Sequence, residues 1–340
     1  MLHGHGDDSY RYKHKIIADF STNVWYGGEP AGMKEHLFNQ WHLVQKYPEV
    51  LAESLSEQVA QHYHLKPGQV LISNGTTESV YLVAQAFRGQ RTTIATPAFA
   101  EYEDACRMHQ HQVEFMPWDK LNSIPRLETD LLFICNPNNP TGSVYFPLEE
   151  LIDRNPQTLF VLDEAFIEFT ISIETAIPLL IRYENLLLLR SMTKAFAIPG
   201  LRLGYIVAHE KRSAQLRDLK FPWSVNALAI AAGKYIFDNY KHIQLPLRQL
   251  LKDKEALTFQ LQQEAGVKVH ESHTHFFLAE TAHSTAAELK QYLVEKHGIL
   301  IRDASNFRGL NEKHFRVATL TPARNQLLIQ ALTTWNKHCS

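Results

Sequence analysis

Short runs of branched apolar residues alternate with helical patterns between residues 50 and 225. The runs are "VLIS" at 70, "TTIAT" at 92, "LLFIC" at 131, "LFVLDE" at 159, "NLLLLRS" at 185 and "LGYIV" at 203. A continuous apolar run is typical of a strand buried in a mainly parallel sheet that has helices on both faces. The pattern therefore predicts an α/β domain whose functional loops lie at the carboxyl ends of its strands.

After residue 225 the pattern changes to long helical stretches, which are followed by short strand-like runs and further helices. This order predicts a second, smaller α+β lobe. Residues 1–45 are too short and irregular to fold alone, so we expect them to pack on the smaller lobe or to reach a neighbouring subunit. The sequence thus predicts a large lobe over residues 46–224 and a small lobe formed by residues 1–45 together with 225–340.

Composition and charge limit the classes of molecule that this protein can be expected to bind. The chain has 340 residues and carries 34 basic against 36 acidic side chains, a formal net charge of -2 at pH 7. This balance, without a basic run interleaved with aromatics, disfavours nucleic acid. The first residues lack the apolar core of a secretion signal, and no apolar run reaches the roughly 20 residues of a membrane-spanning helix. We expect a cytoplasmic protein that acts on a small molecule and binds neither nucleic acid nor a membrane.

Cysteine and histidine give no complete pattern of a metal site. Cys106, Cys135 and Cys339 lack metal-ligand spacing and are odd in number, so we expect reduced, mostly structural thiols. The 18 histidines are densest in "MHQH" at 108–111 and "HESHTH" at 270–275. Metal binding is one interpretation of these clusters. Since no carboxylate or cysteine pattern completes a site, we interpret them as histidines on surface loops or strand faces and predict no metal.

Two loops at strand ends offer an anion site and an ordered amide. In "SNGTTES" the backbone N–H groups of Gly75, Thr76 and Thr77 lie at a predicted helix start, where the helix dipole favours an anion; a plain helix cap is the alternative. The loop "CNPNNPTG" holds three asparagines and two prolines in a turn. Such a turn can fix Asn139 with its amide facing the sheet edge.

A carboxylate and a lysine follow two further apolar runs. Asp163 ends the run "LFVLD", where an unpaired carboxylate is costly, so a cation or a helix cap should face it. Lys194 follows "NLLLL" within "SMTKAFAIPGLRLGY", between Ser191 and Thr193 on one side and Arg202 on the other. A lysine in a desolvated pocket loses proton affinity and can form a Schiff base, although a solvated loop lysine is the common case.

Together these loops fit one ligand, pyridoxal 5′-phosphate, whose ring acts as an electron sink. Lys194 would bind its aldehyde, Asp163 would keep its ring nitrogen protonated, and Asn139 would donate to its phenolic oxygen. Phe99, after another strand, could stack on the ring. The predicted phosphate cradle comprises Gly75, Thr76, Thr77, Ser191, Thr193 and Arg202.

Three segments, "NPNNPTG", "LDEAF" and "SMTKAFAIPGLRLGY", resemble in order and spacing those of the fold-type I aminotransferases of class I/II. The likeness covers nearly the whole chain. It implies the aspartate aminotransferase-like fold, a large domain with a mainly parallel seven-stranded sheet and a smaller α+β domain. It also implies that Lys194 forms the Schiff base, Asp163 holds the pyridine nitrogen, Phe99 stacks on the ring and Arg202 binds the phosphate.

Within that family the chain is similar to two groups that act on phosphorylated amino compounds. These are the histidinol-phosphate aminotransferases and the L-threonine-O-3-phosphate decarboxylases of cobalamin side-chain synthesis. The segments "HGHGDD", "FSTN" and "FPWSVNALA" resemble those of the decarboxylases. Phe166 stands where aminotransferases of the histidinol-phosphate type usually carry a tyrosine, as it does in the decarboxylases, although packing alone could also select a phenylalanine.

The resemblance also implies the substrate anchors. Arg316 takes the substrate carboxylate, and Arg302 takes the substrate phosphate with help from His5 and Asn23, while two structural ion pairs are the alternative for the arginines. His3 fits nearly as well as His5. Tyr47 matches a tyrosine that reaches the active site of the neighbouring subunit, which implies a homodimer with shared sites.

We therefore expect decarboxylation of L-threonine O-3-phosphate to aminopropanol phosphate. The alternative is transamination of histidinol phosphate or another amino acid with a 2-oxo acid. The two reactions differ in which bond to Cα stands perpendicular to the cofactor ring. The spacing of residues in the sequence does not determine that orientation. A non-catalytic binding protein of the same fold is a third, weaker interpretation, because every cofactor-facing residue type is present.

Overall fold

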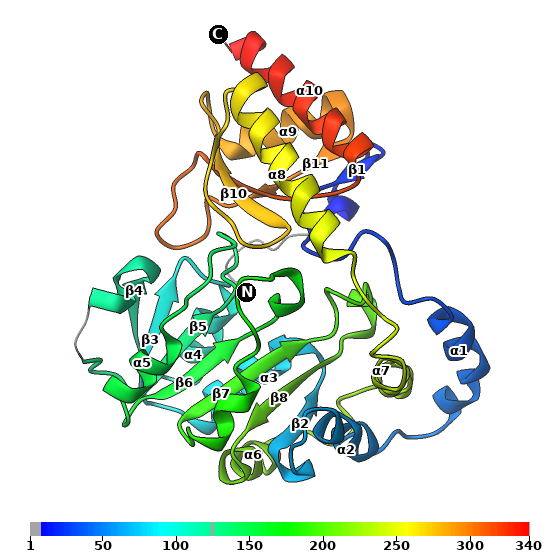
Figure 1. Cartoon of the computed structure of the whole chain (residues 1–340), viewed down its shortest axis with the longest axis vertical. Helices are drawn as coiled ribbons and strands as arrows, with labels where there is room; N and C mark the ends of the chain where they lie inside the picture. The colour runs from blue at the N-terminus through cyan, green and yellow to red at the C-terminus, as the bar shows by residue number, and fades with distance from the viewer. Residues whose placement is uncertain (1–7, 124–125, 340) are drawn as a thin grey trace.

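The computed structural model describes residues 8–123 and 126–339 and consists of two lobes (Figure 1). The large lobe is built on one seven-stranded sheet, and the strand order from edge to edge is β2-β8-β7-β6-β5-β3-β4. The strands are β2 (Val70–Ser73), β3 (Arg91–Thr96), β4 (Gln112–Pro117), β5 (Leu131–Cys135), β6 (Leu159–Asp163), β7 (Leu186–Ser191) and β8 (Gly204–Ala208). The predicted mainly parallel seven-stranded sheet is therefore confirmed.

The sheet is parallel from β4 to β7 and antiparallel at β8, which pairs with both β7 and β2. Every residue of β5, β6 and β7 is buried, as their apolar runs predict. Because these three strands run the same way, their carboxyl ends meet at one edge of the sheet. That edge carries the loops that begin at Cys135, Asp163 and Ser191.

The apolar runs in the sequence did not predict β4, which is an edge strand of the large sheet. Its six residues are all either exposed or half-buried, and its sequence "QVEFMP" carries no continuous apolar run. An edge strand that faces solvent on one side needs only every second side chain to be apolar.

Helices cover the large sheet and surround its core. They are α1 (Met33–Asn39), α2 (Glu53–His62), α3 (Gly75–Ala86), α4 (Glu101–Met108), α5 (Leu148–Arg154), α6 (Glu210–Arg217) and α7 (Ala227–Asp238). The start of α7 is capped by the side chain of Asn226, which accepts from the backbone N–H of Ala229 at 2.8 Å. Helix α2 packs against β2 and α7, and α3 packs against β7 and β8.

The small lobe has a four-stranded antiparallel sheet in the order β12-β13-β10-β9. Its elements are α8 (Leu247–Glu264), β9 (Lys268–Val269), β10 (Phe276–Glu280), α9 (Ala286–His297), β11 (Ile299–Leu300), β12 (Arg302–Asp303), β13 (His314–Ala318) and α10 (Pro322–Cys339). Strand β1 (Ala18–Asp19) joins this lobe by pairing in parallel with β11.

The two faces of the small sheet differ in character. Phe277, Ala279, Phe315 and Val317 belong to the apolar core that this lobe shares with α8, α9 and α10. Because side chains alternate along a strand, the neighbours of these residues lie on the opposite face. Those neighbours include the polar residues Glu280, His314 and Arg316 and the apolar residues Phe276 and Leu278, so the second face carries both kinds of side chain.

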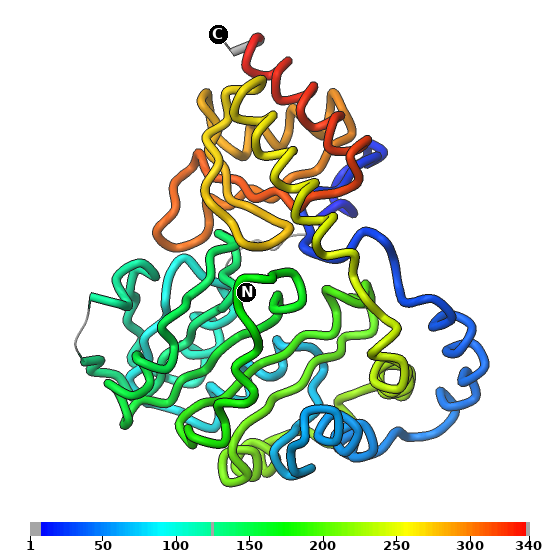
Figure 2. The backbone as a smooth tube through the Cα atoms, in the orientation of Figure 1, coloured from blue at the N-terminus to red at the C-terminus, as the bar shows by residue number. Residues whose placement is uncertain are grey.

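The division between the lobes differs from the predicted boundary at residue 224. The core of the large lobe includes Met33 and the buried residues of α7, although the sequence assigned both segments to the small lobe. Leu250 of α8 belongs to the large core and Leu257 to the small one, so α8 spans both. Figure 2 shows the chain passing from β1 of the small lobe to α1 beside the large lobe, and returning through α8. The long apolar face of α7 explains the difference, because it needs a large core to cover it.

No helix of the described chain is both long and apolar enough to cross a membrane.

Candidate functional site

A cavity of about 410 Å³ lies between the lobes, over the carboxyl ends of the parallel strands. Both lobes and the segment after β1 contribute to its wall. The predicted site residues that line it are Asn23, Thr76, Thr77, Phe99, Asn139, Asp163, Thr193, Lys194, Arg202, Arg302 and Arg316. One cavity thus brings together residues separated by nearly the whole length of the sequence.

Four predicted residues lie elsewhere or behind the wall. Gly75 and Ser191 are buried next to the cavity, beside Arg202 and Thr193 respectively. Tyr47 is 85% exposed and contacts Trp223, away from this chain's own cavity. His5, like its alternative His3, falls outside the described residues.

Asp163 ends β6 and is buried at the base of the cavity. Its Oδ2 accepts a hydrogen bond from the Tyr102 hydroxyl at 2.5 Å, and its Oδ1 accepts one from the backbone N–H of Ala165 at 2.8 Å. Burial raises the pKa of Asp163, while the Tyr102 and Ala165 hydrogen bonds and the positive charge of Lys194 act in the opposite direction. A cationic group bound in the cavity would further stabilise the ionised carboxylate of Asp163.

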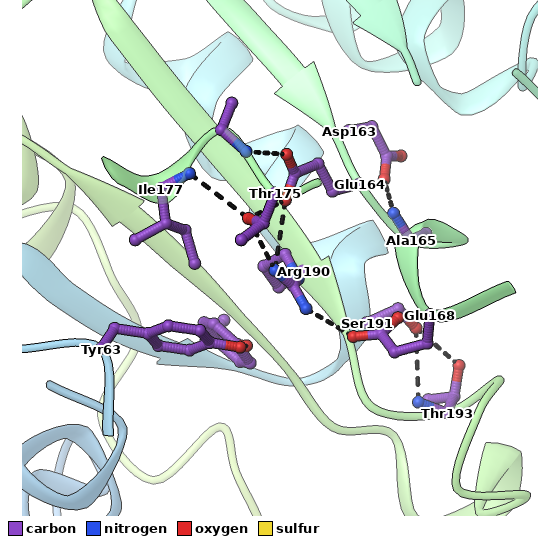
Figure 3. Close-up of polar contacts among 12 residues, drawn as sticks. Tyr63, Asp163, Glu164, Ala165, Glu168, Thr175, Ile177, Arg190, Ser191 and Thr193 are labelled. Atoms are coloured by element: carbon purple, nitrogen blue, oxygen red, sulfur yellow. Dashed lines mark hydrogen bonds and ion pairs between the residues drawn. The ribbon is translucent and has the colours of Figure 1, made fainter. Parts of the chain in front are cut away.

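A buried ion network supports this edge of the sheet from behind (Figure 3). Arg190 of β7 donates to Glu164 at 3.2 Å and to Thr175 at 3.0 Å, and it also forms an ion pair with Glu168. Glu164 follows Asp163 directly, and Arg190 precedes Ser191. The network therefore joins the end of β6, which carries Asp163, to the end of β7, which carries Ser191. Breaking one member would leave buried charge unpaired, which is strongly destabilising.

In the predicted phosphate cradle, Arg202 approaches closely to Gly75, the first residue of α3. Its φ is +73°, a left-handed conformation that favours glycine, and a Cβ atom built there would lie 2.4 Å from Nη2 of Arg202. A larger residue would force this guanidinium to move away from the start of the helix. Ser191 and Thr193 complete the cradle, with their hydroxyl oxygens 2.9 Å apart. Backbone N–H groups, two hydroxyls and a guanidinium suit a phosphate.

Lys194 lies three residues beyond the end of β7 and lines the same cavity. Its backbone carbonyl accepts a hydrogen bond from the N–H of Trp25 at 2.9 Å. That bond ties the loop bearing the lysine to the segment that follows β1, which carries Asn23. The amine is therefore presented between the large lobe and the amino-terminal segment.

Asn139 contacts the small lobe across the cavity. Its Oδ1 accepts a hydrogen bond from Nη1 of Arg316 at 2.5 Å. This contact fixes which end of the amide faces Arg316, so the amide nitrogen is the group that can donate elsewhere. The geometry agrees with a donor role toward a phenolic oxygen.

Arg302 and Arg316 are buried opposite one another on β12 and β13. Arg302 donates to the carbonyl of Asp303 at 2.7 Å and to Oδ1 of Asn306 at 2.9 Å. Arg316 donates to the carbonyl of Ser21 at 2.5 Å, and its buried Nε has no hydrogen-bond partner among the residues that the structure describes. Burial and the charge of Arg302 lower the pKa of Arg316. Two adjacent buried cations in a cavity wall favour a ligand with two anionic groups.

Asn23 points to the same need for a ligand. It is 3% exposed, and both polar atoms of its side chain lack a hydrogen-bond partner within the described chain. A buried amide without partners costs free energy comparable to that of lost hydrogen bonds. A polar ligand in the cavity would satisfy it.

The sequence did not reveal Tyr102 and Asn306 as site residues. Tyr102 lies one turn beyond Phe99, and its ring stacks on Phe133 at 5.2 Å. Asn306 follows Arg302 by four residues and fixes its guanidinium. The two residues lie in the segments "TPAFAEY" at 96–102 and "GILIRDASN" at 298–306, but only the fold shows that their polar groups turn toward Asp163 and Arg302.

The donor set fits pyridoxal 5′-phosphate. The Gly75 cradle could accept the phosphate, Lys194 could supply the amine, and Asp163 could provide a buried carboxylate for the protonated ring nitrogen. Bound there, the cofactor would draw electron density from Cα of an amino acid. Phe99 and Phe166 supply apolar parts of the cavity wall.

Comparison with known proteins agrees with this geometry. Residues 16–332 match the family model described as aminotransferase class I and II. The threonine-phosphate decarboxylase of Salmonella typhimurium is 32% identical over 93% of this chain and 90% of its own length. The histidinol-phosphate aminotransferase of Caldanaerobacter subterraneus is 31% identical over 85% of this chain and 84% of its own.

A solved structure, the L-threonine-O-3-phosphate decarboxylase of Porphyromonas gingivalis, superposes with a TM-score of 0.92 and 40% identity. The match covers 94% of this chain and 100% of that one. These likenesses extend over both lobes and every segment that lines the cavity. The chain belongs to the class I and II aminotransferase family of pyridoxal 5′-phosphate-dependent enzymes.

Proposed function

We propose that this enzyme decarboxylates L-threonine O-3-phosphate to (R)-1-amino-2-propanol O-2-phosphate. The buried pair Arg302 and Arg316 carries the proposal, because it opens into the cavity that holds Lys194 and offers two anion sites on adjacent strands. A substrate with a carboxylate and a phosphate separated by a few bonds matches this pair. The threonine-phosphate decarboxylases among the relatives act on such a compound.

In the proposed reaction, Arg316 takes the carboxylate, and Arg302 takes the phosphate. Asn23, buried and without a hydrogen-bond partner within the described chain, assists at the substrate phosphate. The bond between Cα and the carboxylate breaks, its electron pair stays on Cα, and carbon dioxide leaves. A proton then takes its place at Cα, and Lys194 is the residue positioned to supply or relay it. Asp163 keeps the cofactor's ring nitrogen charged, which favours this electron flow.

Phe166 supports the decarboxylase over the aminotransferase. It is 5% exposed, lines the cavity, and its ring meets Phe276 edge-on at 4.9 Å. A phenylalanine provides no hydroxyl for the phenolic oxygen of the cofactor. With that donor absent, the oxygen should hold its proton more tightly.

Carbon dioxide release from L-threonine O-3-phosphate, with cofactor-loaded protein and no 2-oxo acid, tests the proposal. We expect repeated turnover with one carbon dioxide per amine formed. Arg302→Gln and Arg316→Gln should each raise KM by about ten- to hundredfold, since each removes a charge-assisted contact. Absence of carbon dioxide from a fully loaded enzyme would overturn the decarboxylase assignment.

The second candidate is transamination of histidinol phosphate or a related amino acid, which the similarity to histidinol-phosphate aminotransferases favours. Its signature is an absolute need for a 2-oxo acid and formation of the matching amino acid. The same enzyme preparation, assayed with and without 2-oxoglutarate, separates the two reactions. Lys194→Ala should abolish either one.

We further propose that the enzyme works as a homodimer in which Tyr47 serves the partner's cavity. Tyr47 is 85% exposed, and large apolar side chains close in sequence to Tyr47 or to its contact Trp223 are exposed as well: Phe38, Trp41, Val44, Val50, Phe221 and Trp223. The rings of Trp223 and Tyr47 lie 5.3 Å apart between centroids, and the backbone N–H of Trp223 donates to the Val50 carbonyl at 2.8 Å. A patch of this kind marks an interaction surface.

Subunit mixing tests the shared site. In a hybrid of a Tyr47→Ala chain with a Lys194→Ala chain, one site keeps both native residues and the other keeps neither. Random mixing of equal amounts gives half hybrids, so about a quarter of wild-type activity should return from two impaired variants. No recovery on mixing, with dimers confirmed by light scattering, would place Tyr47 outside the partner's site.

A further inference from the structure

Three potential metal ligands converge on the second face of the small sheet, outside the set of residues that lines the catalytic cavity. They are His270, which follows β9, Glu280 at the end of β10, and His314 at the start of β13. Their ligand atoms all lie within 4.8 Å of one another. The sequence interpretation left the histidines of "HESHTH" without a carboxylate, and the register of the sheet supplies one.

Strand pairing explains the convergence. Glu280 is the direct cross-strand partner of His314 on one side and of Lys268 on the other. His270 lies two residues after Lys268 and therefore on the same face as these side chains. The backbone N–H of His270 donates to the Leu278 carbonyl at 2.9 Å, so the sheet pairing extends to His270. Backbone hydrogen bonds on three neighbouring strands thus fix the positions of the three groups.

Glu280 is the centre of the cluster. Its Oε1 lies 2.8 Å from Nε2 of His270 and 3.7 Å from Nε2 of His314. The two imidazole rings are stacked at 5.7 Å with an angle of 28° between their planes. Both Nε2 atoms therefore face one carboxylate oxygen, as ligands around a shared ion do.

Asn311 holds the ring of His314 from its other side. The Oδ1 atom of Asn311 lies 2.8 Å from Nδ1 of His314, closer than the backbone nitrogen of Asn311 at 3.2 Å. The backbone N–H of Asn311 also donates to Nδ1, and Nε2 is left facing Glu280. An oxygen partner at the second ring nitrogen is characteristic of metal-binding histidines.

The place beside Glu280 already attracts a cation. Lys268 reaches Oε1 of Glu280 at 2.7 Å, although its side chain is 69% exposed. An exposed ion pair of this kind contributes little stability, so the ammonium can move into solvent when a stronger cation arrives. A divalent ion would gain two imidazole ligands that an ammonium group cannot use.

We propose that His270, Glu280 and His314 bind a divalent transition-metal ion of the zinc type. Two imidazole nitrogens and one carboxylate oxygen are ligands that Zn²⁺ accepts, with water in the remaining position. The side chains of His270 and Glu280 are 34% and 20% exposed, which leaves room for that water and a path of entry. On binding, Nε2 of His270 loses its proton to solvent or to Nδ1.

The ion would join three strands next to the predicted carboxylate anchor. His314 and Arg316 lie two residues apart on the same face of β13. An ion held between β10, β13 and the residue after β9 resists separation of these strands. The site therefore stabilises the small lobe and the strand that carries Arg316, and takes no part in the chemistry at Lys194.

Isothermal titration of chelator-treated holoenzyme with zinc chloride tests the site, using protein without a histidine tag. We expect one equivalent per chain in addition to any weaker surface binding. Glu280→Gln and His314→Asn should each weaken this binding by about tenfold or more, since each removes a ligand. Lys268→Met should strengthen it, because it removes the competing ammonium. His14→Asn, at an exposed histidine elsewhere, is the matched control and should change nothing.

Thermal unfolding provides the second measurement. Zinc should raise the melting temperature of the wild type and of Lys268→Met, but not of Glu280→Gln, since an ion that binds only the folded state stabilises it. The visible spectrum of the cofactor should stay constant during the titration, which excludes chelation by the cofactor. Equal zinc affinity in the wild type and Glu280→Gln, or no gain in Lys268→Met, would show that the cluster is only an ion network.

Discussion

Tyr102→Phe removes a single hydroxyl and tests how the protein controls the charge of Asp163. The hydroxyl donates to Oδ2 of Asp163 at 2.5 Å inside the core. The phenylalanine ring can keep the stacking on Phe133, so the substitution opens no large cavity. The change therefore isolates one hydrogen bond to a buried carboxylate.

The expected size of the effect follows from that hydrogen bond. A hydrogen bond to a charged group contributes about 1.5–3 kcal/mol, which corresponds to about a ten- to hundredfold change in an equilibrium constant. Burial already raises the pKa of Asp163, and the Tyr102 hydroxyl counteracts it. Without the hydroxyl the carboxylate becomes the stronger base and competes with the cofactor's ring nitrogen for the proton. Turnover should fall by about ten- to hundredfold, with the cofactor still bound.

Steady-state kinetics and cofactor titration measure the two parts of this prediction. Tyr183→Phe is the matched control, because its hydroxyl donates to Asp153 at 2.9 Å, outside the catalytic cavity. The control should lose stability without losing kcat. If Tyr102→Phe kept wild-type kcat, or lost activity only in proportion to lost cofactor, control of the Asp163 charge by this hydroxyl would be refuted.

Three further substitutions give distinct readouts. Lys194→Ala should bind the cofactor without the visible absorbance of a lysine Schiff base and should show no turnover; an unchanged spectrum would contradict its role. Asp163→Asn should lose most turnover. It should nevertheless stabilise the cofactor-free protein, and by more as pH rises, because burial raises the pKa of Asp163 and only the ionised form is penalised. Denaturant unfolding of both proteins at acidic and neutral pH measures this difference in stability, and a difference that does not depend on pH would refute the prediction. Gly75→Ala should weaken cofactor binding by about tenfold or more, because its Cβ would meet Arg202. Gly89→Ala is the control: its φ is +80° with open space around it, so it should cost only about 1 kcal/mol of stability. Equal cofactor affinity in the two variants would contradict the role of Gly75 in the phosphate cradle.

The strands with continuous apolar runs could be predicted from the sequence, since β2, β5 and β6 begin where their runs begin. The loops after them could be predicted too, because parallel strands bring their carboxyl ends together. The antiparallel course of β8 was not predictable, because its buried residues read the same in either direction. Strand direction depends on the connection and not on the composition of the strand.

Partnerships across strands were the second limit. Nothing in "HESHTH" indicates that Glu280 and His314 lie beside His270, because their meeting depends on the register of three strands. In the same way, the sequence suggested Arg302 and Arg316 separately, but their position opposite one another follows from the pairing of β12 with β13. The placement of α7 also depended on which core had room for its apolar face.

Helix α8 sets how far apart the two lobes can be. Leu250 packs in the large core and Leu257 in the small one, about 10 Å apart along one uninterrupted helix without an internal glycine or proline. Such a helix transmits force as a stiff rod, so opening it by bending would break backbone hydrogen bonds. Under the proposed function, in which Arg316 takes the substrate carboxylate, a fixed separation of the lobes would hold Arg316 at a constant distance from Lys194 and would select amino acids by their length.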